Sequence, residues 1–176
     1  NALEAWGSGE LKDSTDADAI AAELEEKVDA LLAERFGLEI PAIVALQGES
    51  VKRRLHRFAA LQAARAVEGW RVMATERKMK VVYGHTTVAG RCDRIDFNER
   101  TGEWCVVDYK TWDSKDRAVA FEQPKDKETG KTIRVWKSLQ LPLYCAMLDA
   151  DPDFPEAKRE HITASYCILA PRCQAL

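Results

Sequence analysis

The chain has 176 residues, of which 46% are hydrophobic, so it holds enough apolar material for the core of one domain. Its formal net charge of -3 excludes a protein that binds nucleic acid through overall charge alone. No run of roughly 18 apolar residues could span a membrane, and the chain opens without the pattern of a signal peptide. We therefore expect a soluble, cytoplasmic protein with no membrane partner.

The first elements are predicted to be helices. The segment DSTDAD favours a helix start, and the alanine- and leucine-rich run at residues 19–37 has the apolar spacing of a helix and ends at Gly37. Residues 38–48 contain Pro41 and are predicted to be a connector.

A second helix is predicted over residues 49–70, ending at Gly69. Its buried stripe is expected to consist of Leu55, Phe58, Leu61, Ala64 and Val67. The stretch from Val51 to Lys80 is rich in Lys and Arg, which indicates either a solvated face, the usual case, or a surface that faces phosphates.

Three strands are predicted next, over residues 71–83, 87–97 and 103–112. The polar connector NERTG joins the last two and suits a hairpin, so the three strands are expected to form an antiparallel meander.

The remainder is predicted as a long functional loop at residues 113–134, a third helix at 135–149 that tolerates Pro142 only with a local adjustment, and a final strand at 161–170. This order predicts an α/β fold, a mixed central sheet with an antiparallel hairpin, flanked by helices. We expect one domain over residues 1–176, with a helical part at 1–69 and a core at 70–176.

The hairpin register brings two carboxylates together. If the strands pair symmetrically about NERTG, Ile95 faces Val106, and the next pair on that face is Asp93 opposite Asp108. Two adjacent carboxylates repel unless one is protonated or a cation lies between them. The alternative partner, Asp96, requires the opposite register parity and gives poorer pairs.

The same register places Arg91 opposite Lys110, and these like charges require an anion such as a phosphate or a splayed strand end. Lys110 shares a strand face with Asp108, whereas Tyr109 points away and leaves its carbonyl near the carboxylates. Oxygen ligands with room for water suit Mg²⁺ or Mn²⁺. On the residues alone, a metal site and a surface salt bridge of Lys110 with an aspartate both remain open.

The segments GRCDRID and VVDYKT resemble the active-site hairpin of the PD-(D/E)XK nuclease superfamily, in particular of its RecB-like branch. The segment WKSLQLPLY resembles the QxxxY motif of that branch, with Gln140 and Tyr144 one helical turn apart. Three motifs in the family order, over roughly residues 70–148, are more specific than any one of them.

The resemblance implies a restriction-endonuclease-like fold and assigns roles to residues of this chain. The implied catalytic residues are Asp93, Asp108, Lys110, Gln140 and Tyr144. The implied ligands of Mg²⁺ or Mn²⁺ are Asp93, Asp108 and the backbone carbonyl of Tyr109. Glu76 matches an acidic position that can join them, although it could also be an exposed partner of Arg77 or Lys78.

The resemblance also implies a setting. The order of GW, an acidic strand residue, GxxDRID and LQLPLY is similar to that in the nuclease domains of AddB-type and RecB-type helicase-nucleases. We therefore expect a domain excised from a larger protein, with DNA, single-stranded or as duplex ends, as substrate. The expected partners are the helicase part of the parent and a second helicase-nuclease subunit.

That branch has a metal-binding His in an early helix, and NALEAWG resembles the residues that follow it. His56 is an alternative donor, but a single His on a basic helix is more typical of a surface residue or a phosphate contact. We expect DNA contacts from Arg91, Arg94 and His56.

The cysteines argue against disulfides and clusters. The five cysteines lack CxxC spacing and are expected to be reduced, buried thiols. Some relatives carry an iron–sulfur cluster with three cysteines near the C-terminus, but only Cys167 and Cys173 lie there, so no iron–sulfur cluster is expected.

The leading hypothesis is a divalent-metal-dependent exodeoxyribonuclease that acts in double-strand-break processing and recombinational repair. One alternative is a non-catalytic DNA-binding or scaffold module with a degenerate nuclease fold. Another is a stand-alone repair or phage-type exonuclease.

Overall fold

The computed structural model describes residues 2–37, 39–111 and 138–169, together with residues 121–122, 129–130, 132, 135–136 and 174–175. Its helices are α1 (Ala2–Gly7), α2 (Ala17–Phe36), α3 (Ala42–Val67) and α4 (Gln140–Asp149), with 3-10 turns η1 (Glu10–Asp13) and η3 (Arg159–His161). Its strands are β1 (Trp70–Tyr83), β2 (Thr86–Asn98), β3 (Trp104–Lys110), β4 (Phe121–Glu122), β5 (Val135–Trp136), β6 (Ile162–Ile168) and β7 (Gln174–Ala175).

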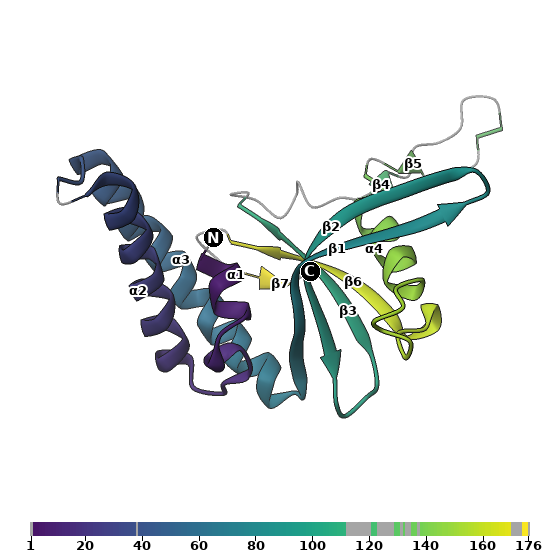
Figure 1. Ribbon diagram of the computed structural model, residues 1–176, viewed down its shortest axis with the longest axis horizontal. Coiled ribbons are helices and arrows are strands. Elements are labelled where there is room, and N and C mark those ends of the chain that lie inside the picture. The colour runs from purple at the N-terminus through teal and green to yellow at the C-terminus, as the bar shows by residue number, and fades with distance from the viewer. Residues whose placement is uncertain are drawn as a thin grey trace.

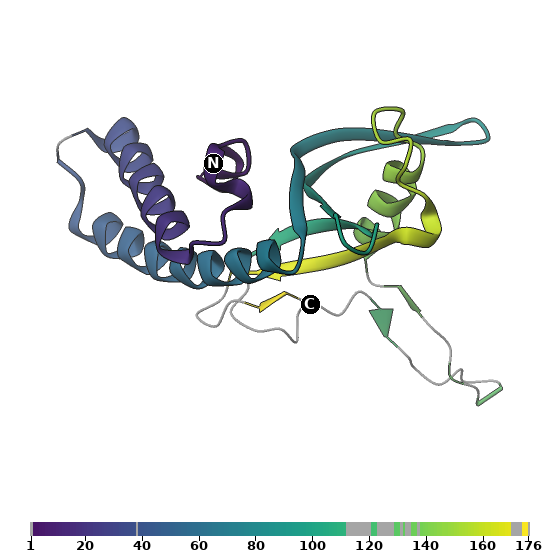
Figure 2. The same cartoon turned by 90° about the horizontal axis from the view of Figure 1, so that it is seen from below.

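Five strands form one mixed sheet in the order β1-β2-β3-β6-β7, with β3 and β6 parallel and the other neighbours antiparallel. Helices α1, α2 and α3 lie on one side of this sheet and α4 on the other (Figures 1 and 2). The predicted α/β class, the meander and the flanking helices are confirmed, and the arrangement is consistent with a restriction-endonuclease-like fold.

The two faces of β3 build two separate cores. Cys105 and Val107 pack with α1, α2 and α3 in a cluster around Trp6 and Phe58, whose rings meet edge to face with centroids 5.2 Å apart. On the opposite face, Val106 packs in a second cluster that includes residues of α4. Because strand side chains alternate, one strand stabilises both layers.

Helix α2 begins at Ala17, directly after Asp16 of the predicted start signal DSTDAD. The Asp16 carboxylate accepts hydrogen bonds from the backbone N–H groups of Asp18 and Ala19, which satisfies two donors at the start of α2. The helix ends at Phe36, and Gly37 follows with a positive φ of 68°. Both predicted boundaries are confirmed.

The predicted connector at residues 38–48 is wrong, because α3 already begins at Ala42, directly after Pro41. A proline at a helix start sacrifices no hydrogen bond, so it begins this helix instead of interrupting a loop. Gly48 lies inside α3 and is buried against α2, where an added Cβ would lie 2.9 Å from Leu32 Cδ1. The glycine permits the close approach of the two helices.

The buried stripe of α3 is also rotated from the predicted one. Leu55 and Phe58 are buried as expected, but Ala64 and Val67 are exposed. The remaining buried positions are Gly48, Ala59, Gln62, Ala63 and Ala66. Small residues fill this face because the helix lies close to its neighbours, and apolar spacing alone does not reveal that preference.

Two further boundaries differ from prediction. The third helix, α4, begins at Gln140 and not at residue 135, because residues 135–136 form β5, paired with β4. Pro142 therefore lies in the first helical turn, where a missing N–H needs no local adjustment. Apart from β4 and residues 129–130 and 132, the predicted loop at residues 113–134 lies outside the described residues. The short helix α1 was not predicted.

Strands β1 and β2 continue beyond the sheet as a two-stranded arm, residues 77–92, that ends in a turn at Gly84 (Figures 1 and 2). Two irregularities in β1 precede the arm: the pairing shifts between Val72 and Ala74, and Glu76 has a positive φ of 49°. Such irregularities bend a strand, so the arm leaves the direction of the sheet. Over the part of the chain that is described, no helix is long and apolar enough to cross a membrane.

Candidate active site

The register of the β2–β3 hairpin is the predicted one. Ile95 pairs with Val106 and Phe97 with Trp104, and Gly102 takes the positive φ of 74° that the turn requires. The described ladder ends with Arg94 opposite Val107. The next position toward the open end therefore holds Asp93 and Asp108.

Asp93 is tied directly to β3 at this point. Its Oδ2 accepts a hydrogen bond of 2.8 Å from the backbone N–H of Tyr109. In an antiparallel ladder the N–H and C=O of one residue point to the same neighbour, so the Tyr109 carbonyl also points to the β2 side, where Asp93 lies. Backbone and side-chain oxygens thus converge at the end of the hairpin.

Asp108 is buried, with 1% of its surface exposed, although it carries a carboxylate. Its Oδ1 accepts a 2.6 Å hydrogen bond from Gln140 Nε2. Its Oδ2 lies 2.5 Å from Lys110 Nζ in an ion pair, and within the described residues no further group donates to this buried oxygen. Burial raises the pKa of Asp108; Lys110 opposes that rise and repulsion from Asp93 adds to it.

The amide of Gln140 links the two charged residues of β3. Lys110 Nζ donates to Gln140 Oε1 over 3.1 Å, while Gln140 Nε2 donates to Asp108 and, over 3.1 Å, to Tyr144 Oη. The Tyr144 hydroxyl donates in turn to the carbonyl of Arg91 over 2.7 Å. The first two turns of α4 therefore hold Asp108, Lys110 and β2 in one network.

The structure thus brings together Asp93, Asp108, Lys110, Gln140 and Tyr144, the five residues singled out in the sequence. The oxygens that could hold a divalent cation are those of Asp93 and Asp108 with the Tyr109 carbonyl. The buried carboxylate of Asp108 next to the position of Asp93 fits such an ion, because a cation offsets the repulsion between two carboxylates. Among the described residues, no three His, Cys, Asp or Glu side chains form a metal-binding group, so the donor set here is two carboxylates and a carbonyl.

Glu76 lies level with Asp93, since the flanking β1–β2 pairs are Thr75 with Arg94 and Arg77 with Cys92. Its Oε2 lies 2.9 Å from Arg91 Nε, so one cation that it contacts is Arg91 of the neighbouring strand. A contribution of Glu76 to metal binding stays a prediction.

The predicted like-charge contact of Arg91 with Lys110 takes a different form. Within the described ladder, β2 and β3 are not paired beyond Arg94 and Val107. Arg91 contacts Glu76, whereas Lys110 contacts Asp108 and Gln140. The strand ends are therefore splayed. This is one of the two arrangements expected from the sequence, the other being an anion between Arg91 and Lys110. Arg91 is 62% exposed and remains available to an anion.

The predicted DNA contact of Arg94 is wrong, because Arg94 is only 2% exposed. Its guanidinium binds both oxygens of Asp96, at 2.5 and 2.7 Å, and donates to the hydroxyl of Tyr109 at 3.3 Å. Burial acts to lower the pKa of Arg94, but Asp96 and Tyr109 raise it further, so the group stays charged. Arg94 is a structural residue on the face of the hairpin opposite Asp108.

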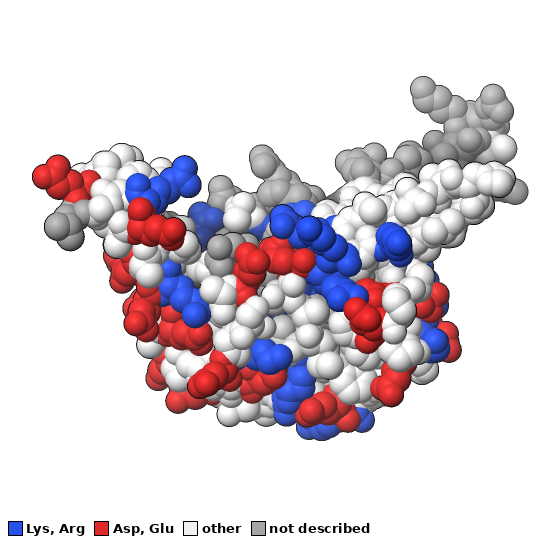
Figure 3. All heavy atoms as spheres, in the orientation of Figure 1, with Lys and Arg blue, Asp and Glu red and all other residues white. Residues whose placement is uncertain are grey.

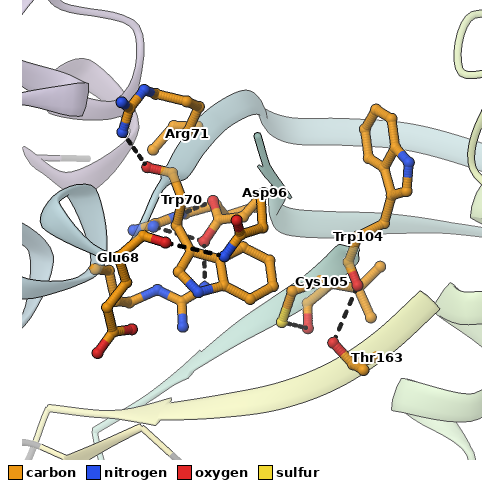
Figure 4. Close-up of polar contacts among 12 residues, drawn as sticks. Glu68, Trp70, Arg71, Asp96, Trp104, Cys105 and Thr163 are labelled. Carbon is orange, nitrogen blue, oxygen red and sulfur yellow. Dashed lines mark hydrogen bonds and ion pairs between the residues drawn. The ribbon is translucent and has the colours of Figure 1, made fainter. Parts of the chain in front are cut away.

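Arg65 of α3 completes this buried network by donating to Asp96 Oδ2 over 3.0 Å. Figure 4 shows Asp96 in the interior close to Trp70, and the Arg65 guanidinium lies 4.4 Å from the centre of the Trp70 ring. This network was not predicted. The opposite charges of Arg94 and Asp96, two residues apart on one strand face, were its local signal, whereas its third member, Arg65, lies on a distant helix.

His56 and the described cysteines lie in contacts that hold the fold together. His56 Nε2 of α3 lies 2.6 Å from Glu25 Oε1 of α2, so it takes part in a helix–helix contact. Four cysteines are free and buried as predicted, namely Cys92, Cys105, Cys145 and Cys167, and burial raises the pKa of the Cys92 thiol to about 12. Cys173 lies outside the described residues.

Comparison with known proteins extends the resemblance to the whole chain. A search of the curated proteins finds no match. The family model described as the PD-(D/E)XK nuclease superfamily matches residues 1–174. Nucleases of this superfamily generally use divalent metal ions, and the fold implies DNA as the substrate. On this match, and with the hairpin and α4 in the arrangement described, the chain belongs to the PD-(D/E)XK nuclease superfamily.

Proposed function

We propose that the chain is a Mg²⁺- or Mn²⁺-dependent deoxyribonuclease that hydrolyses DNA phosphodiester bonds from an end. The observation that carries the proposal is the buried carboxylate of Asp108, which is paired with Lys110 and lies next to the position of Asp93, so that two carboxylates and an ammonium meet at the end of the hairpin. Gln140 and Lys110 offset this burial only in part, because the pKa of Asp108 stays raised, and a bound cation would offset the remainder.

Each residue of the site has a role in this chemistry. Asp93, Asp108 and the Tyr109 carbonyl would hold the ion, which supplies charge stabilisation at the phosphate and lowers the pKa of bound water. Lys110, whose side chain is 21% exposed, can donate a hydrogen bond to the attacking water or to the phosphate.

The residues of α4 orient these groups. Gln140 contacts Asp108 and Lys110 at once, so it fixes the distance between the carboxylate and the ammonium. Tyr144 fixes Gln140 to the backbone of β2. Such supporting contacts reduce the reorganisation that a reaction would otherwise require.

We further propose that the chain acts as the nuclease domain of an ATP-dependent helicase-nuclease in double-strand-break processing and recombination. The order of its motifs supports this setting. Delivery of DNA by a helicase would also explain how a chain with a net charge of -3 acts on a polyanion.

The test is cleavage of linear duplex and single-stranded DNA with Mg²⁺ or Mn²⁺, with closed circular DNA as the substrate that an exonuclease leaves intact. Asp108→Asn should abolish cleavage. Asp18→Asn makes the same change at an exposed position of α2 and should leave cleavage unchanged.

Calorimetry with Mn²⁺ provides a second readout that does not depend on turnover. Binding that disappears in both Asp93→Asn and Asp108→Asn supports the proposed metal site. If the parent protein neither cleaves DNA nor binds the ion through these carboxylates, the chain is a scaffold with a nuclease fold.

A further inference from the structure

The arm formed by residues 77–92 differs in charge from the rest of the chain. It contains Arg77, Lys78, Lys80 and Arg91 and no Asp or Glu, in a chain with a net charge of -3. Basic side chains concentrated on one element are typical of a surface that binds phosphates.

Three of these four cations remain available at the surface. Arg77 is bound by Asp151 and Asp153, which join the base of the arm to the segment after α4. Lys78 and Lys80 are exposed, and within the described residues neither has an ion-pair partner. Arg91 is 62% exposed and contacts Glu76.

The pairing of the arm places like charges together. Lys78 is the direct cross-strand partner of Arg91, and Lys80 follows two residues later on the same face. Like charges directly opposite one another destabilise a strand pair, and the single carboxylate of Glu76 offsets one of them. An anion bound at this face would remove the remaining repulsion.

The charged residues of the arm begin beside the active site. Arg91 contacts Glu76, which lies level with Asp93, and the Arg91 carbonyl accepts the Tyr144 hydroxyl. From Arg77 to Gly84 the arm rises roughly 23 Å, at about 3.3 Å for each residue. Figure 3 shows Lys and Arg side chains gathered near the middle of the molecule, where the arm leaves the sheet, and acidic side chains mainly over the helices to the left.

A hollow of about 420 Å³ lies beside these lysines. Lys78 and Lys80 line it together with Met79, Ala89 and Pro152, so apolar surface adjoins two lysines. The Asp151 carboxylate, which also lines it, is paired with Arg77. An unpaired base can pack on apolar surface while its phosphate contacts a lysine, whereas the bases of a duplex are stacked inside the helix. The hollow therefore favours a single strand.

We propose that the arm binds the phosphate backbone of a single DNA strand through Lys78, Lys80 and Arg91 and leads that strand to Asp93 and Asp108. This inference rests on the proposed nuclease function and adds the path by which the substrate reaches the site. The two lysines of β1 follow one another at about 6.6 Å along the strand, a spacing comparable to that of successive phosphates in an extended strand.

The test is DNA binding by fluorescence anisotropy in EDTA, over a range of salt concentrations, with a labelled single-stranded oligonucleotide. The variant Lys78→Ala/Lys80→Ala should bind about tenfold more weakly. The slope of log K against log salt should become shallower by roughly 1.4, or about 0.7 for each phosphate that a lysine no longer neutralises. The charge-conserving variant Lys78→Arg/Lys80→Arg should bind like the unmodified protein.

The matched control is Lys27→Ala/Lys52→Ala, which removes the same charge from α2 and α3 and should leave the slope unchanged. An unchanged slope in the arm variant overturns the proposal. So does an equal loss of affinity for a blunt duplex, because the arm would then bind duplex DNA. Binding in EDTA requires no cleavage. If the protein does not cleave DNA but its arm variant still shows the expected change in slope, the nuclease function is refuted and the proposed role of the arm stands.

Discussion

Strands β2 and β3 carry a charged cluster on each face, and the two clusters differ in how their charges are compensated. Behind the hairpin, Asp96 is fully buried and binds the guanidinium groups of Arg94 and Arg65. In front of it, Asp108 is almost as buried, but among the described residues its Oδ2 is paired with one partly exposed ammonium, that of Lys110, and its pKa stays raised.

The difference separates a stabilising network from a functional one. A buried ion pair with its hydrogen bonds satisfied holds a structure in place, whereas a buried carboxylate whose charge is offset only in part, as the raised pKa of Asp108 indicates, is destabilising unless a ligand binds it. The same residue type on the same two strands is therefore expected to respond in opposite ways to the same substitution.

Asp96→Asn is expected to have the largest effect on stability. It leaves two guanidinium groups without their carboxylate, one of them buried, and should lower the free energy of unfolding by about 3–5 kcal/mol. Urea denaturation followed by circular dichroism measures the change. Asp108→Asn is the matched substitution in the opposite cluster and, in EDTA at neutral pH, should not lower the free energy of unfolding. Equal losses would contradict the comparison.

Gln140→Leu should separate support of the site from support of the fold. The amide contacts Asp108 and Lys110, so its loss should lower the cleavage rate at saturating DNA by about 10- to 100-fold while the far-ultraviolet spectrum stays unchanged. Gln47→Leu, at an exposed position of α3, is the control and should cleave normally. A rate equal to that of the control would exclude a supporting role for Gln140.

Tyr144→Phe removes one hydroxyl and keeps the ring that packs against β2. The absence of the hydrogen bonds to the Arg91 carbonyl and to Gln140 should cost about 1 kcal/mol of stability. Tyr83→Phe at the exposed tip of the arm should cost nothing measurable. The urea midpoints of both variants give the answer, and equal midpoints would count against the Tyr144 contact.

The pH dependence of Asp108→Asn gives the finest distinction. The folded-state pKa of Asp108 is raised, so its neutral form favours folding below the unfolded pKa of about 3.9, and this contribution is lost as the pH rises through the folded pKa. In EDTA, Asp108→Asn should therefore gain stability relative to the unmodified protein between acid and neutral pH. If the difference in unfolding free energy between the two proteins stays constant across this pH range, the pKa of Asp108 is not raised by folding.

Local signals in the sequence were sufficient for the hairpin and its carboxylates. The connector NERTG determines the register, and the register determines that Asp93, not Asp96, adjoins Asp108. Likewise, the spacing of Gln140 and Tyr144 predicted that both lie on one face of a helix, and both contact the site.

Features that depend on distant segments could not be predicted in this way. Burial of Arg94 depends on Asp96 and on Arg65, which lies in a helix about thirty residues earlier. No periodic pattern in the sequence connects residues so far apart. The rotated face of α3 depends on how closely α2 approaches Gly48. The short α1 is held by the burial of Trp6, and six residues are too few to show helical periodicity.

The parallel pairing of β3 with β6 has a consequence for folding. The β2–β3 hairpin closes through a short connector, but β6 joins β3 only after the long segment that includes α4, as in the pair of Lys110 with Ile168. Contacts between residues so far apart in sequence form slowly because of the entropy of closing the loop. We expect Asp93 and Asp108 to meet early and Gln140 to arrive later. In pulsed hydrogen exchange, the amide of Leu169, which donates to the Lys110 carbonyl, should gain protection after the hairpin amides.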